Sequence, residues 1–132
     1  ERPLQSLVDI EQCSLIQCSS RPEIWRDWFA SQGFAAVQAY RGPRFDTFSM
    51  CLQAAIDGMG IAIMPRMFAQ RALASGQLVQ AWPYVQPSDG AYYVAYASHC
   101  SAEPKIRSFV DWLLEQAQDY AASGDAVGDS KR

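Results

Sequence analysis

The spacing of apolar residues switches repeatedly between the helical and the strand period, and the clearest helix follows Asp46 and Thr47. Either residue can cap that helix by accepting a hydrogen bond from a free backbone N–H. The apolar residues that share one face of this helix are Phe48, Leu52, Ala55, Ile56 and Met59. Residues 61–64, directly behind it, are apolar at every position, which is typical of a strand buried on both faces in a parallel sheet.

The rest of the pattern predicts an alternation of short helices and strands. Further helices are expected at 4–10, 22–32, 66–74 and 104–120, and further strands at 14–18, 35–41, 78–82 and 91–97. Trp25, Trp28 and Phe29 share a face of the second helix and are expected mostly in the core. This alternation predicts an α/β fold with mostly parallel strands and right-handed crossovers. Residues 121–132 are expected to be a disordered tail, because Gly, Asp, Ser and Lys dominate there.

Charge and the start of the chain narrow the class of protein. Fourteen acidic residues against eleven basic ones give a net charge of −3, and no basic block is present. This balance disfavours nucleic-acid binding, since phosphate contacts need clustered Lys and Arg. No apolar run approaches the roughly 18 residues of a membrane span. The start lacks a Met and a signal-peptide pattern, so we expect a cytoplasmic location and a piece of a longer protein.

The cysteines allow two interpretations. The chain has Cys13, Cys18, Cys51 and Cys100, and no CxxC pair. Cys13 and Cys18 are close enough in sequence to bridge in an oxidising compartment. Reduced thiols in a cytosolic protein are the simpler interpretation, and the one favoured here.

Motifs for catalysis and metal binding are lacking. There is no GxSxG elbow, and the glycines at 58 and 60 lead into a strand, whereas a dinucleotide fingerprint opens a helix. The single histidine, His99, has no ligand partners at metal-site spacing. Asp46 and Asp57 are interpreted as a cap and a solvated helix residue. The sequence therefore predicts no catalytic residue, no metal site and no cofactor.

The turn at 41–48 is the candidate binding site. It joins a predicted strand end to a helix start, where free N–H groups and a partial positive charge collect. Arg41 and Arg44 offer donors for a carboxylate, and Phe45 and Phe48 offer apolar walls. The alternative is an ordinary capped turn with two surface arginines. The residue types alone do not decide between the two.

An ordered set of short motifs carries a family resemblance. The motifs lie at 41–45, 52–55, 58–65, 73, 76–79, 92–93 and 109–113. Their order and spacing resemble the effector-binding domain of LysR-type transcriptional regulators, in the subgroup of glycine-cleavage and β-lactamase regulators. Trp25 and Trp28 before Gly33 fit that subgroup, and the resemblance covers residues 3–118.

The resemblance implies an α/β domain like a periplasmic binding protein, with two lobes and a cleft that holds a small molecule. It assigns residues 1–88 to the second lobe and residues 89–120 to a strand and a helix that return to the first lobe. Most of the first lobe and the winged helix-turn-helix are expected to lie outside this chain, which by itself should not bind operator DNA. A homo-oligomer with antiparallel pairing is typical of the family.

The resemblance also implies ligand contacts. They fall on Phe45, Thr47, Phe48 and Tyr92, with Tyr93 as a weaker candidate beside the two arginines of the turn. Some relatives have serine where this chain has Thr47-Phe48. Phe48 makes the expected pocket more apolar, so a relative's ligand is not expected to transfer. A small carboxylate is the ligand class that the turn favours.

Two other functions remain open from the residues. A stand-alone solute-binding module would use the same cleft but would need a signal peptide. A small α/β enzyme would need a charged or nucleophilic cluster in the pocket. A further expectation concerns the last helix, whose apolar residues Phe109, Val110 and Leu113 are predicted to pack onto the second lobe or onto another chain.

Overall fold

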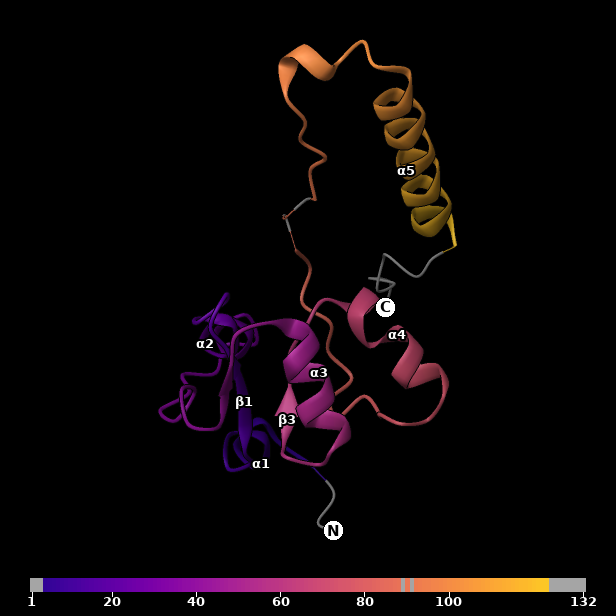
Figure 1. Cartoon of the computed structure of the whole chain (residues 1–132). Coiled ribbons are helices and arrows are strands. Elements are labelled where there is room, and N and C mark those ends of the chain that lie inside the picture. Colours follow the sequence, from indigo (N-terminus) through magenta and orange to yellow (C-terminus); the bar gives the residue numbers. More distant parts are fainter. Residues whose placement is uncertain (1–3, 89, 91, 124–132) are drawn as a thin grey trace. The chain divides into compact units, whose positions relative to one another are not determined.

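The computed structural model describes residues 4–88, 90 and 92–123, and the chain divides into two units, Glu1–Gln86 and Pro87–Arg132 (Figure 1). The first unit contains all of the strands found in the described residues. Its elements are α1 (Leu7–Glu11), β1 (Leu15–Cys18), α2 (Ile24–Ala30), β2 (Arg44–Phe45), α3 (Phe48–Ile56), β3 (Ile61–Ala62) and α4 (Arg66–Ala74). The second unit contains a 3-10 turn, η1 (Ser98–Cys100), and the helix α5 (Pro104–Ala122).

The strands of the first unit form one parallel sheet in the order β2-β1-β3. The central strand β1 is buried at every position. Gly42 and Gly60 allow its neighbours to come close: a Cβ at Gly42 would lie 2.0 Å from the backbone oxygen of Leu15, and one at Gly60 would lie 2.1 Å from that of Ser14. Their φ angles of +149° and +154° are also unfavourable for residues with a Cβ. The predicted α/β class with parallel strands is confirmed.

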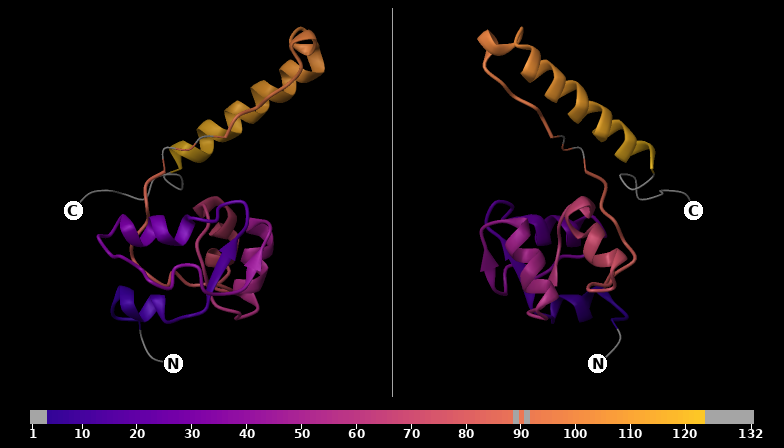
Figure 2. Two further views of the ribbon diagram at one scale, coloured as in Figure 1. Left: turned by 90° about the vertical axis from the view of Figure 1, so that its left-hand side faces the viewer. Right: turned by 45° about the vertical axis from the view of Figure 1, so that its right-hand side comes forward.

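The core consists of two apolar clusters on opposite faces of β1, because successive side chains of a strand point to opposite sides. Leu15 lies on one face with Trp25, Trp28 and Phe29 of α2. Ile16 lies on the other face, where α3 contacts all three strands. Figure 2 shows the ribbon from two further sides. The three aromatic rings of α2 pack at centroid distances of 5.2–5.8 Å, so the predicted aromatic core is confirmed.

The predicted helices are present, with shifted ends. Thr47 caps α3: its hydroxyl accepts a hydrogen bond from the N–H of Met50 at 3.4 Å. Pro104 occupies the first turn of α5, as the sequence predicts. Helix α5 continues through Ala122, so the tail predicted for 121–132 is wrong for its first two residues. Alanine favours a helix, and nothing in that stretch ends it earlier. Residues 124–132 of the predicted tail lie outside the described residues.

Three predicted strands do not form within the described residues, at 35–41, 78–82 and 92–97. A further strand would have to pair with β2 or β3, the outer strands of the sheet, and each of these is only two residues long. Instead of pairing as a strand, the segment 35–41 places single residues in the core, among them Ala39, which is 1% exposed. The segment 78–82 is held partly by a side chain, since the Trp82 indole N–H donates to the Gln32 amide oxygen at 2.9 Å.

The second unit contains the expected helix, as α5, but no strand is found among its described residues. No strand pairs with residues 92–97 in the described part of the chain, and residue 91 lies outside it. The predicted strand at 91–97 therefore does not form within the described residues 92–97, and the return of this segment to a first lobe stays a prediction. None of the residues of α5 is fully buried, and Phe109 is 57% exposed. The expected packing of this helix onto the first unit or another chain stays a prediction.

Candidate functional site

The candidate ligand site is the carboxyl edge of the sheet, where the helices that follow β2 and β3 begin. β2 runs directly into the cap of α3, and β3 runs through residues 63–65 into α4. Because the strands are parallel, both helices begin at the same edge. Their first turns touch, with the rings of Phe48 and Phe68 5.5 Å apart. This edge therefore combines two partly positive helix starts with an aromatic wall.

Phe45, Thr47 and Phe48 are brought together by the short step from β2 into α3. Thr47 is exposed, and its hydroxyl, which accepts from the N–H of Met50, retains a proton to donate. Phe45 and Phe48 are half-buried against the apolar cluster around Ile16. Of the residues that sequence analysis singles out, these three form one constellation.

The two arginines of the turn lie elsewhere. The register pairs Arg44 with Gln17 and Phe45 with Cys18, so Arg44 points to the opposite face of the sheet from Phe45. Arg44 is exposed and forms no ion pair within the described part of the chain. The strand β2 lies within the predicted turn 41–48, and its two side chains face opposite sides of the sheet.

Arg41 precedes β2 and lies at the amino edge of the sheet, away from Thr47. Its guanidinium donates to the amide oxygen of Gln38 at 3.0 Å. With Gly42 it lines an open cavity of ≈ 310 Å³, whose other walls are Gln12, Cys13 and Ser14. Sequence analysis did not foresee this cavity, because the two sides are brought together only by the pairing of β1 and β2.

Tyr92 and Tyr93 belong to the second unit. Their side chains are exposed there, at 75% and 88%. The 3-10 turn that follows carries His99, which is also exposed. Across residues 4–88, 90 and 92–123, no three His, Cys, Asp or Glu side chains come together as metal ligands.

Gln17 is a buried polar residue in the central strand that sequence analysis passed over. Its amide N–H group donates to the carbonyl oxygens of Leu15, at 3.0 Å, and Ala39, at 3.1 Å. The side-chain amide oxygen of Gln17, Oε1, is also buried, and it has no protein partner among the described residues. The residue thereby ties the segment 35–41 to the sheet through a side chain.

The next residue, Cys18, and Cys51 of α3 form a buried pair of thiols. Burial and, second, the neighbouring Cys18 raise the pKa of Cys51 to about 11. A bridge between Cys13 and Cys18, one of the sequence hypotheses, does not fit the fold. Cys13 precedes β1 and Cys18 ends it, and β1 alone extends about 10 Å at roughly 3.3 Å per residue. A disulfide needs Cα atoms within about 7 Å.

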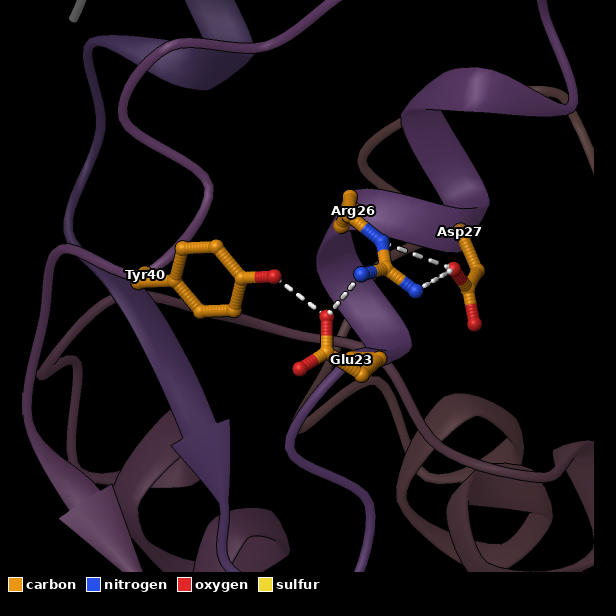
Figure 3. A network of polar contacts seen from close by, with 4 residues as sticks. All are labelled: Glu23, Arg26, Asp27 and Tyr40. Atoms are coloured by element: carbon orange, nitrogen blue, oxygen red, sulfur yellow. Dashed lines mark hydrogen bonds and ion pairs between the residues drawn. The ribbon is translucent and has the colours of Figure 1, made fainter.

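An exposed polar network joins the segment 35–41 to α2 (Figure 3). The Tyr40 hydroxyl donates to the Glu23 carboxylate, and this hydrogen bond is the main cause that raises the pKa of Tyr40. Arg26 pairs with Glu23 at 2.7 Å and with Asp27 at 2.9 Å, and its hydrogen bond to Asp27 raises the pKa of the guanidinium. Both acidic groups are thus engaged within the network, which positions the chain before β2.

The fold is that of an α/β domain with parallel strands, a class in which ligands commonly sit outside the carboxyl ends of the strands. The chain belongs to the LysR substrate binding domain family, which matches residues 1–118. The resemblance carried by the sequence motifs is therefore confirmed. No helix in the described residues is long and apolar enough to cross a membrane.

Curated relatives agree with this family. The chain is 34% identical over 103 residues to the HTH-type transcriptional regulator TrpI of Pseudomonas aeruginosa, covering 77% of this chain and 34% of that protein. It is 31% identical over 117 residues to the glycine cleavage system transcriptional activator of Escherichia coli K12, covering 89% and 38%. It is 31% identical over 111 residues to the HTH-type transcriptional activator AmpR of Rhodobacter capsulatus, covering 84% and 37%.

The chain spans between 34% and 38% of the length of these relatives. They are regulators of transcription, among them the glycine-cleavage and AmpR proteins that represent the expected subgroup. No solved structure matches the chain significantly.

Proposed function

We propose that this chain is the effector-sensing portion of a LysR-type regulator of transcription, and that it has no catalytic activity. The observation that carries the proposal is the family match over residues 1–118. In this proposal the DNA is bound by a winged helix-turn-helix outside these residues, and the regulator works in the cytoplasm as a homo-oligomer. The net charge of −3 supports a sensing rather than a DNA-binding role for the chain itself.

The domain layout of the proposal follows the family. Residues 1–88 form one lobe of a two-lobed domain like a periplasmic binding protein, and residues 89–120 lead back to the other lobe. The effector binds between the lobes, and the carboxyl edge of the sheet is one wall of its site. Tyr92 and Tyr93 are the residues by which the returning segment would contribute to that site.

The chemistry of this wall favours a small acid with an apolar part. A helix leaves its first N–H groups without intrahelical partners, and Thr47 satisfies the N–H of Met50. The N–H groups of Phe48 and Ser49, in the same turn, are then the donors for a carboxylate, supported by the positive end of α3. The Thr47 hydroxyl adds a donor, and the rings of Phe48 and Phe68 hold the apolar part. Arg41, at the opposite edge, has no role in this proposal.

A thermal-shift screen of the regulator that contains this chain tests the proposal. Small carboxylic acids, and amides and amines of matched size, are added one at a time. A true effector at a hundredfold excess over its Kd stabilises the folded protein by about 2.7 kcal/mol. We expect acids to raise Tm and their amides to have no effect.

Matched variants locate the site. Thr47→Ala should weaken binding of the acid, whereas Thr47→Ser keeps the hydroxyl and should retain most of the affinity. Arg41→Ala, at the other edge, serves as the control and should leave the affinity unchanged. Binding that is lost in Arg41→Ala and kept in Thr47→Ala would place the ligand at the amino edge and overturn the proposed site.

A further inference from the structure

An open cavity lies at the amino edge of the sheet, at the other end of the strands from the proposed effector site. Its volume is ≈ 310 Å³, and it is lined by Gln12, Cys13 and Ser14 on one side and by Arg41 and Gly42 on the other. These residues precede β1 and β2, and the pairing of the two strands brings them together. The proposed function gives this cavity no role.

Arg41 is held in place at the wall of the cavity. Its backbone N–H donates to the carbonyl oxygen of Gln38 at 3.0 Å, and its guanidinium donates to the side-chain oxygen of the same residue, also at 3.0 Å. Gln38 is fixed in turn, because its N–H donates to the carboxylate of Glu11 at 2.7 Å. The bond to Gln38 uses Nη1, so the edge formed by Nε and Nη2 has no partner among the described residues. That edge is therefore an oriented fork, which loses little freedom when it binds an anion.

Arg44, in the same predicted turn, lacks these features. It is exposed, and it forms neither a hydrogen bond nor an ion pair within the described part of the chain. It does not line the cavity. The chain thus provides one arginine that is positioned at a cavity and a neighbouring one that is not.

The remaining walls provide neutral donors and no negative side chain. The Ser14 hydroxyl and the Gln12 amide have no protein partner among the residues that the structure describes. Glu11 precedes these residues in sequence, but its carboxylate does not line the cavity and accepts from Gln38 instead. The groups around the cavity are therefore suited to an anion.

This set of donors favours a phosphate group. A carboxylate presents two oxygens in one plane, and an arginine fork alone satisfies it. A phosphate monoester presents three acceptor oxygens, so that two can bind the fork of Arg41 and the third can accept from Ser14 or Gln12. The cavity lies at the lower end of the range of roughly 300–1,000 Å³ that is usual for small-molecule pockets, which leaves room for an organic part.

Two other kinds of ligand fit less well. A metal ion would be repelled by Arg41, and no three His, Cys, Asp or Glu side chains come together within the described residues. A nucleic-acid backbone needs clustered Lys and Arg, whereas Arg41 is the single cationic residue among those that line the cavity. A small phosphorylated molecule needs only one such group.

We propose that this cavity is a second ligand site, which binds a small phosphate monoester through Arg41, with Ser14 and Gln12 as further donors. The inference does not rest on the proposed function, because the proposed effector site lies at the opposite edge of the sheet. The two sites also differ in chemistry: one takes a phosphate, and the other takes a carboxylate with an apolar part.

Isothermal titration calorimetry of the regulator that contains this chain tests the site. The probes are inorganic phosphate and ribose 5-phosphate, and ribose is the uncharged control. All titrations are made at one ionic strength, because salt screens exposed charges. We expect both phosphates to bind and ribose not to bind. Absence of binding by both phosphates, or equal binding of ribose, would overturn the proposal.

Matched arginine variants locate the binding. Arg41→Ala should raise the Kd of ribose 5-phosphate at least about tenfold, because hydrogen bonds from a charged donor contribute at least that much. Arg41→Lys keeps the charge but loses the fork, and should retain only part of the affinity. Arg44→Ala removes the same charge outside the cavity and should leave Kd unchanged. Equal losses in Arg41→Ala and Arg44→Ala would mean that the probes bind surface charge alone, which refutes the site.

A second variant covers the case in which Arg41→Ala folds poorly. Ser14→Ala removes one neutral donor from the opposite wall and should raise Kd at least about twofold. An unchanged Kd in Ser14→Ala would remove that wall from the site and contradict the proposed binding mode.

The failure of this inference differs from the failure of the proposed function. Phosphate binding that is lost in Thr47→Ala and kept in Arg41→Ala would place the phosphate at the carboxyl edge, and so overturn the second site. Phosphate binding that depends on Arg41, in a regulator that binds no small acid, would support the second site and overturn the proposed function.

Discussion

Replacing Gly42 by alanine is expected to separate β2 from β1 and to destabilise the first unit more than alanine at Gly33, Gly58 or Gly76, where an added Cβ would meet nothing within 4 Å. An added Cβ would lie 2.0 Å from the backbone oxygen of Leu15 and 2.7 Å from its carbonyl carbon. Backbone atoms of a buried central strand cannot move aside as a flexible side chain does. The alanine must therefore displace the chain that enters β2.

The magnitude follows from what that displacement breaks. The N–H of Gln17 donates to the oxygen of Pro43 at 2.8 Å, and the N–H of Ser19 donates to that of Phe45 at 2.8 Å. Each such bond contributes about 1 kcal/mol net. The φ of +149° adds strain of roughly 1–2 kcal/mol for a residue with a Cβ. The sum is about 3–4 kcal/mol, a large part of the 5–15 kcal/mol that is typical of a domain.

Gly33→Ala is the matched control. Gly33 also has a positive φ, of +72°, but a Cβ there would meet nothing within 4 Å. Only the strain of about 1 kcal/mol is expected. Urea unfolding followed by tryptophan fluorescence measures both variants, because Trp25 and Trp28 are buried beside β1. Equal losses of unfolding free energy in the two variants would refute the close approach of β2 to β1.

Three further substitutions test single interactions. Trp25→Phe removes the indole N–H that donates to the buried oxygen of Ile16 at 2.9 Å, and should cost about 1–3 kcal/mol in urea unfolding followed by circular dichroism. Thr47→Ala removes the cap of α3 and should cost about 1 kcal/mol by the same measurement, with Thr47→Ser close to wild type. Ultraviolet titration should show Tyr40 ionising above its ordinary pKa of 10.0, and Glu23→Gln should bring that pKa back down, since the hydrogen bond to Glu23 favours the protonated phenol. Because the raised pKa belongs to the folded state, this stabilisation is present below the ordinary pKa and is lost as pH rises through the folded value. An unchanged pKa in Glu23→Gln would contradict the assignment.

Helices were predictable from the sequence because their hydrogen bonds are local. The cap at Thr47 and the proline at Pro104 lie where the sequence predicts them. Strands were less predictable, because the partner of a strand is not encoded in its own residues. The segment 35–41 contains several apolar residues, but the outer strands that it could pair with, β2 and β3, are only two residues long.

The candidate site was only partly predictable, because it too depends on how a strand pairs. Sequence analysis treated residues 41–48 as one turn, and a strand as short as β2 has no period to reveal it. Once β2 forms, its two residues face opposite sides and its two ends lie at opposite edges of the sheet. Phe45, Thr47 and Phe48 consequently stay together, while Arg41 is carried to the amino edge. The cavity beside Arg41 and the pair of buried thiols depend on contacts between elements, which residue spacing does not reveal.

Gln17 explains why the chain before β2 takes the path that it does. An extended segment beside a sheet normally satisfies its backbone through a ladder, but 35–41 lies over one face of the sheet, where no ladder is available. Gln17 supplies a side-chain donor to Ala39 at 3.1 Å, in the middle of a strand that is otherwise apolar or thiol-bearing. Tyr40 then reaches the Glu23 carboxylate at the start of α2, and Gly42 allows the chain to turn in against Leu15. A polar residue in the central strand thus directs a loop that leads to β2, and through β2 to the Thr47 end of the proposed effector site.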